Sequence, residues 1–235
     1  MTRFLLVHGS GHGAWCWREV LPLLTSRGHQ AKAIDLPGGD VTLDDYADFI
    51  LAALEGPSVI VAHSMGGYPA SAAALKDPSQ IARIIYLTSY IPVHGKSLAD
   101  RRREVVEQPL LPAFVKSSDG KDISFDPSMT RALLYHDCSD AQFAYAQSLL
   151  KPQPVLPQVT PLALNMGFEA LPKSYIICDD DKAIPPLLQS QIASVLPARE
   201  IAHLPSSHSP FFSMPARLVE VILGLCAAEG ARACA

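Results

Sequence analysis

Apolar and polar positions divide this chain into two kinds of alternating segment. Short runs that are apolar on both faces predict buried parallel strands, and longer segments between them have helical spacing. The predicted strands span residues 4–7, 31–36, 59–62, 81–87, 174–178 and 199–204. The predicted helices span residues 14–27, 42–54, 65–76, 186–194 and 214–228. This alternation is typical of an α/β protein with a doubly wound, mostly parallel sheet of about six strands.

Residues 92–166 interrupt the alternation with many prolines, a basic run and scattered large apolar residues. A segment of this kind between two strands predicts a cap, or lid, over the carboxyl ends of the strands, where α/β sheets bind ligands. The alternative is an additional layer that only packs on the sheet. Residues 1–91 and 167–235 would form the core. The run Arg101-Arg102-Arg103 predicts a solvated helix face, with an anion site as the alternative.

The strongest candidate for chemistry is Ser64, which directly follows a short apolar strand and precedes a helix rich in small residues. Ala62 and Gly66 stand two positions before and after it, so the pattern G-x-S-x-G is matched except at its first glycine. Such a serine lies in a tight turn that presents its hydroxyl above the sheet. The alternative is a serine that only begins a helix beside a tight turn.

A base and an orienting acid follow two later strands. In the chain order found for this kind of site, the acid follows a late strand and the histidine follows the last one. Asp179, Asp180 and Asp181 come after the strand 174–178, and His208 comes after the last strand. The residues alone predict a serine, histidine and aspartate triad, and they leave the choice among the three aspartates open.

The turn after the first strand, residues 9–13, contains three glycines that let the backbone approach a substrate. Acyl transfer needs two N–H donors for the developing oxyanion, and we assign them to the backbones of Ser10 and Met65. The alternative for such a turn is a dinucleotide-binding loop. The spacing lacks the last glycine of G-x-G-x-x-G, which disfavours that alternative.

Composition narrows the class of protein further. The 235 residues are 49% apolar and 18% charged with a net charge of −4, which indicates one large globular domain and disfavours nucleic acid or an anionic membrane surface as partner. There is no signal-peptide pattern and no apolar run long enough for a membrane helix, so we expect a cytoplasmic protein. Five scattered cysteines argue against a disulfide framework or a zinc site.

Several motifs together resemble one branch of the α/β-hydrolase superfamily, that of the hydroxynitrile lyases and the plant methylesterases, including methyl salicylate esterase. They are the opening 4–17, the elbow 62–67 and the segments 135–139 and 178–185. The resemblance implies an α/β-hydrolase fold with an inserted cap. It also implies a small-molecule ester as substrate, and neither metal nor cofactor. It places the triad on Ser64, Asp181 and His208, because the family's acid is the aspartate directly before Lys182-Ala183-Ile184-Pro185.

Two positions separate esterases from lyases within that branch. The lyases resemble one another in having threonine after the first motif histidine and lysine after the catalytic histidine, where this chain has Gly9 and Ser209. A serine carboxylesterase is therefore predicted, with a hydroxynitrile lyase or a non-catalytic small-molecule receptor as alternatives.

The expected substrates are small, mostly apolar or aromatic esters. Candidate pocket residues are Gly9, Phe114, Phe125, Phe143, Tyr145 and Phe211. The sequence does not identify the acyl and alcohol parts of the substrate. It also leaves open whether the protein forms a homodimer.

Overall fold

Six parallel strands form the main sheet of the computed structural model, which describes residues 1–105 and 108–230. Their order is β2-β1-β3-β4-β8-β9. The strands are β1 (Arg3–Val7), β2 (Gln30–Ile34), β3 (Ser58–His63), β4 (Ile81–Leu87), β8 (Lys173–Cys178) and β9 (Ile201–Leu204). The predicted α/β class and parallel sheet are confirmed, and every predicted strand is present with ends shifted by a few residues.

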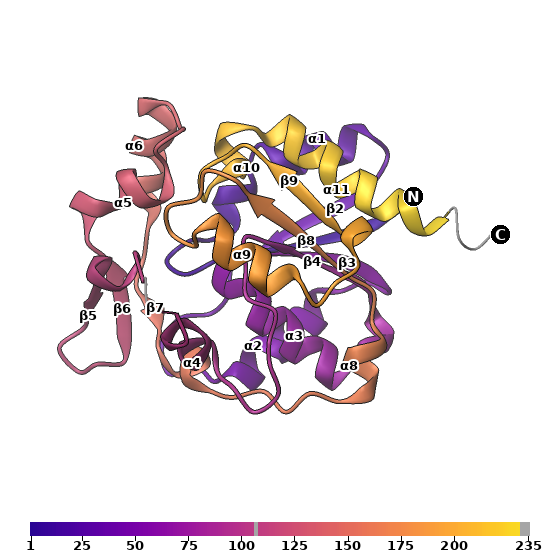
Figure 1. The fold of residues 1–235 in the computed structure, drawn as a ribbon, viewed down its shortest axis with the longest axis horizontal. Helices are drawn as coiled ribbons and strands as arrows, with labels where there is room; N and C mark the ends of the chain where they lie inside the picture. Colours follow the sequence, from indigo (N-terminus) through magenta and orange to yellow (C-terminus); the bar gives the residue numbers. More distant parts are fainter. Residues whose placement is uncertain (106–107, 231–235) are drawn as a thin grey trace.

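Helices cover both faces of this sheet (Figure 1). Because strand side chains alternate between faces, Leu5 and Val7 of β1 pack with α2 and α3, whereas Phe4 and Leu6 pack with α1 and α11. The helices of these layers are α1 (Val20–Ser26), α2 (Leu43–Ala53), α3 (Gly67–Lys76), α8 (Met166–Ala170), α9 (Pro186–Ala193), α10 (Pro210–Ser213) and α11 (Pro215–Gly230).

Two predicted helices are broken near their first turn, and a third begins one residue later than predicted. Residues 14–17 form a separate 3₁₀ turn before α1, and a 3₁₀ turn over residues 64–66 precedes α3. Pro215 begins α11, in agreement with the preference of proline for the first helical position, where no amide hydrogen is needed. The predicted helix 42–54 is observed as α2, and Thr42 caps it by accepting a hydrogen bond from the Asp45 amide.

The segment between β4 and β8 contains helices and a small antiparallel sheet that the sequence did not predict. Figure 1 places α5, α6 and this sheet on one side of the main sheet. These elements are α4 (Leu98–Arg103), β5 (Phe114–Lys116), β6 (Asp122–Phe125), α5 (Pro127–Leu134), α6 (Asp140–Leu149), β7 (Gln153–Pro154) and α7 (Leu156–Val159). The strands β5, β6 and β7 have two to four residues, and the surrounding segment lacks the strand–helix alternation that identified the equally short β9. The cap boundaries at 92 and 166 stay a prediction.

None of the helices in the described part of the chain is long and apolar enough to cross a membrane.

Candidate active site

Ser64 occupies a strained turn between β3 and α3. Its φ of 51° lies in the left-handed region, which is uncommon for residues other than glycine. A Cβ on Gly66 would lie 2.6 Å from the His8 carbonyl oxygen, so no larger residue fits there. Ser89 Oγ donates a hydrogen bond to the Ser64 carbonyl and holds the turn from the end of β4. This geometry is that of the elbow predicted from the sequence.

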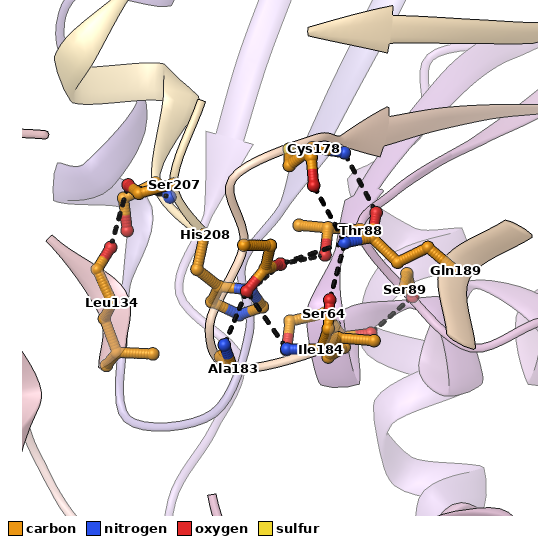
Figure 2. A network of polar contacts seen from close by, with 12 residues as sticks. Ser64, Thr88, Ser89, Leu134, Cys178, Ala183, Ile184, Gln189, Ser207 and His208 are labelled. Atoms are coloured by element: carbon orange, nitrogen blue, oxygen red, sulfur yellow. Dashed lines mark hydrogen bonds and ion pairs between the residues drawn. The ribbon is translucent and has the colours of Figure 1, made fainter. Parts of the chain in front are cut away.

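Asp181 is buried at the centre of a hydrogen-bond network. Figure 2 labels several of its partners, among them Thr88, Ala183 and His208. Its Oδ1 accepts hydrogen bonds from the backbone amides of residues 183 and 184, at 2.7 and 3.0 Å. Its Oδ2 lies 2.7 Å from His208 Nδ1 and accepts hydrogen bonds from Thr88 Oγ1 and Gln189 Nε2. The carboxylate is therefore fixed in one orientation, with one oxygen facing the imidazole.

The three consecutive aspartates have different surroundings. Asp179 is exposed and its Oδ1 lies 2.8 Å from Nδ1 of His203, which is also exposed. Asp180 is exposed as well, whereas Asp181 is 3% exposed. The structure thus brings His208 together with Asp181, the aspartate that the family resemblance selected.

The loop that carries His208 is held from two sides. On the core side, the His63 ring lies 4.6 Å from the His208 ring, and His63 Nε2 lies 3.0 Å from the His208 carbonyl oxygen. On the other side, the Ser207 amide donates to Asp137 Oδ2 at 2.8 Å, and Ser207 Oγ donates to the Leu134 carbonyl (Figure 2). With Nδ1 turned to Asp181, the other ring nitrogen of His208 remains for a second partner.

Two buried histidines fix the glycine-rich turn beside Ser64. His8 Nδ1 lies 2.8 Å from the Gly9 carbonyl oxygen, and its Nε2 accepts from the Leu36 amide at 3.0 Å. His12 Nδ1 lies 2.8 Å from the Ser10 carbonyl oxygen, and its Nε2 lies 2.6 Å from the hydroxyl of Tyr135. The His8 contacts require a neutral ring with the proton on Nδ1, and the His12 contacts fit the same tautomer with the Tyr135 hydroxyl as donor.

Burial lowers the pKa of His8 to about 4 and that of His12 to about 3. Because the unfolded chain binds these protons near pH 6.5, the free energy of unfolding should fall as the pH drops below that value. Each histidine contributes about 1.4 kcal/mol per pH unit between its folded and unfolded pKa. We expect urea unfolding between about pH 5 and pH 7, where most carboxylates are ionised, to show this slope.

In the His8→Gln variant, the slope of the free energy of unfolding against pH should be smaller by about 1.4 kcal/mol per pH unit, the contribution of one proton. His94→Gln, which replaces an exposed histidine, should leave it unchanged. Equal slopes in the wild type and His8→Gln would contradict the interpretation.

The two predicted oxyanion donors come from different segments, Ser10 from the turn after β1 and Met65 from the 3₁₀ helix 64–66. Among the described residues, the Ser10 amide donates to no protein acceptor. The Met65 amide lies in the first turn of the 3₁₀ helix 64–66, where amides have no intrahelical partner. A Cβ on Gly9 would lie 2.8 Å from Ser64 Cβ, so this turn packs directly against the serine.

A cavity of about 400 Å³ lies between the segment after β4 and the loop after β8. Tyr90, Leu110, Phe114, Ala183 and Leu188 are among the residues that line it.

Of the six pocket candidates, Phe114 lines this cavity, and Gly9 contacts the serine turn. Phe125 packs on Phe114, with ring centroids 5.4 Å apart. Phe114 is the only one of the six that lines the cavity, and the remaining three candidates pack against other aromatic rings. Phe211 contacts Trp17 and His63, Phe143 contacts Tyr135, and Tyr145 contacts Trp15. Their role as pocket walls stays a prediction.

Several residues that position the site were not predicted from the sequence. Thr88 and Ser89 follow β4 directly, and Thr88 has a φ of 38° that turns its hydroxyl to Asp181. The signal was their place at the carboxyl end of a strand beside β3. His8 and His12 could have been found as histidines that flank the glycines of the first turn.

Comparisons with known proteins agree with this architecture. The sequence profile of the alpha/beta hydrolase family matches residues 4–221. Methylesterase 7 of Arabidopsis thaliana is 29% identical over 94% of this chain and 95% of its own length. A chain designated methylesterase 15, chloroplastic, of the same plant is also 29% identical, and this chain spans 56% of its length. The crystal structure of a pyrethroid hydrolase from Sphingobium faniae JZ-2 has a TM-score of 0.84 at 29% identity, covering 97% of this chain and 98% of that one.

The expected resemblance to plant methylesterases and the expected fold are thus confirmed. Since the family profile matches nearly the whole chain, this protein belongs to the alpha/beta hydrolase family.

Proposed function

We propose that this protein is a serine carboxylesterase that hydrolyses small, mostly apolar or aromatic esters. The observation that carries the proposal is the buried contact of 2.7 Å between His208 Nδ1 and Asp181 Oδ2, beside a serine in a strained turn. Similarity to methylesterases and to a pyrethroid hydrolase supports the reaction class. Apolar residues such as Leu110 and Phe114 in the cavity support the substrate class.

The reaction proceeds through an acyl-enzyme. His208 Nε2 takes the proton of Ser64 as the serine oxygen attacks the ester carbonyl, while Asp181 holds the imidazole in the required tautomer. The amides of Ser10 and Met65 donate to the oxyanion, and each such donor contributes about 3–4 kcal/mol to lowering the barrier. The alcohol leaves with the proton from His208. Water, activated by the same imidazole, then releases the acid.

A lyase reaction is disfavoured by two positions. A side chain at residue 9 would lie against Ser64 Cβ and the His63 ring, and this chain has glycine there. The residue after His208 is Ser209, which is fully buried and brings no cation to the site. A cyanide anion would therefore be left uncompensated in a dry site, which is costly.

A panel of chromogenic esters of increasing acyl length, with and without aromatic acids, tests the proposal against mandelonitrile. We expect hydrolysis of at least one ester class and no release of cyanide above background. Ser64→Ala serves as the blank for both assays. Cyanide release that matches turnover of the best ester, and that disappears in Ser64→Ala, would overturn the proposal.

A further inference from the structure

The three consecutive arginines of α4 have different environments. Arg101 pairs with Glu104, and Arg103 pairs with Asp100. Arg102 and Arg103 both line the cavity of about 400 Å³, but only Arg102 lacks a carboxylate partner among the described residues. The expectation of a solvated face holds for Arg103, which is exposed, whereas Arg102 is partly buried against the cavity.

Arg102 is held in place by uncharged groups. Its Nη1 donates a hydrogen bond to Gln158 Oε1 at 2.7 Å. The side-chain nitrogen of the same glutamine, Nε2, donates to the Pro154 carbonyl oxygen at 3.2 Å. The Phe114 ring lies 5.5 Å from the guanidinium carbon. Gln158 is 3% exposed, so the arginine is anchored on a buried polar side chain rather than on solvent.

The described residues that line the cavity carry positive charges and no negative one. Arg102, Arg103 and Lys116 are cationic, and Arg103 pairs with Asp100 outside the lining. Arg102 is partly exposed, and the protein around its guanidinium lowers its pKa. Among the described residues it has no carboxylate partner, so an anionic ligand in the cavity would supply the opposite charge.

The same cavity adjoins residues that contact the proposed catalytic residues, although Ser64, Asp181 and His208 themselves do not line it. Ala183 lines it, and the Ala183 amide donates to Asp181 Oδ1. Tyr90 lines it as well and follows Ser89, whose hydroxyl is bonded to the Ser64 carbonyl. A molecule that extends from Ser64 into this cavity would therefore meet apolar walls first and a guanidinium beyond them.

Resting on the proposed esterase function, we infer that the substrate is an ester that carries a free carboxylate, which Arg102 binds while the apolar body of the molecule fills the cavity. The planar guanidinium matches a carboxylate through paired N–H donors, and a lysine would match it less well. The carboxylate belongs to the acyl part, as in a half-ester of a dicarboxylic acid, or to the alcohol part, as in an O-acetyl hydroxy acid.

Kinetics on matched esters test this inference. The monomethyl esters of succinic to suberic acid are compared with methyl esters of the monocarboxylic acids of equal chain length, and O-acetyl hydroxy acids form the second arm. We expect kcat/KM for the best carboxylate-bearing ester to exceed that of its neutral match by about 10–100-fold, the effect of a hydrogen bond to a charged group. The series of esters with the larger ratio of charged to neutral kcat/KM identifies whether the acyl part or the alcohol part of the substrate carries the carboxylate.

Variants of α4 assign the preference to one side chain. Arg102→Met should lose about 10–100-fold in kcat/KM on the charged ester and change by less than about 3-fold on the neutral one. Arg102→Lys should keep part of the preference, because it retains the charge without the planar donors. Arg101→Met removes the same charge from the same helix outside the cavity and should keep all of it.

Binding of adipate to Ser64→Ala by calorimetry separates this inference from the proposed function. If adipate binds to Ser64→Ala and not to Ser64→Ala combined with Arg102→Met, Arg102 is a carboxylate site whether or not an ester is hydrolysed, and absence of hydrolysis then counts against the esterase function alone. If neutral esters are hydrolysed as well as charged ones, and Arg102→Met matches Arg101→Met, the esterase function stands and the inference is overturned.

Discussion

Replacement of Ser64 by alanine should abolish both ester hydrolysis and labelling by a fluorophosphonate probe. The serine oxygen is the atom that forms the acyl bond, so its loss removes the covalent route entirely. Loss of the nucleophile in a serine protease costs about 10⁶ in kcat, and we expect a reduction of that order here. Labelling is measured by mass spectrometry of the intact protein, and hydrolysis by the best ester of the panel.

A second serine of the same segment provides the control. Ser71 of α3 is buried, donates to the Gly67 carbonyl and lies 2.7 Å from the Tyr86 hydroxyl. Ser71→Ala should lower stability by about 1 kcal/mol and retain labelling and hydrolysis. Hydrolysis that persists in Ser64→Ala, or labelling that disappears equally in Ser71→Ala, would remove Ser64 from the proposed mechanism.

The main sheet could be predicted because its strands are apolar runs in regular alternation with helical segments. Runs such as 81–87 and 174–178 are apolar on both faces, as strands covered by helices are, and even the four-residue β9 was placed by the alternation. The strands β5, β6 and β7 have two to four residues and lie in the segment that interrupts this alternation, so they could not be predicted. Broken helices were missed for a related reason. Periodicity continues across residues 14–27 although the backbone changes from a 3₁₀ turn to α1.

The candidate site was predictable where it lies at strand ends. Ser64 and His208 could be named from position, because the carboxyl ends of parallel strands meet at one edge. The choice of Asp181 came from a family resemblance. Its physical basis is burial and two backbone N–H donors, which a run of three consecutive aspartates does not reveal. The inward turn of Arg102 was likewise hidden, since a run of arginines does not show which side chain faces a cavity.

Replacement of Asp181 by asparagine should lower kcat by about 10⁴ while the fold persists. The amides of residues 183 and 184 both donate to Oδ1, so the asparagine oxygen must stay at that position. Its NH₂ group then faces His208 Nδ1, which becomes an acceptor. The ring proton moves to Nε2, and the imidazole can no longer take the proton of Ser64.

Asp179→Asn and Asp180→Asn are the matched controls for this change, since each removes one charge from the same exposed loop without touching His208. Both should keep kcat within a factor of about 3. The three variants are compared by kcat on one ester and by the rate of fluorophosphonate labelling, which depends on the same proton transfer. A severe defect in Asp180→Asn with a mild one in Asp181→Asn would move the acid by one residue. Equal, mild effects in all three would mean that His208 finds its tautomer without a carboxylate, and the hydrogen bonds around Asp181 would then serve only the loop.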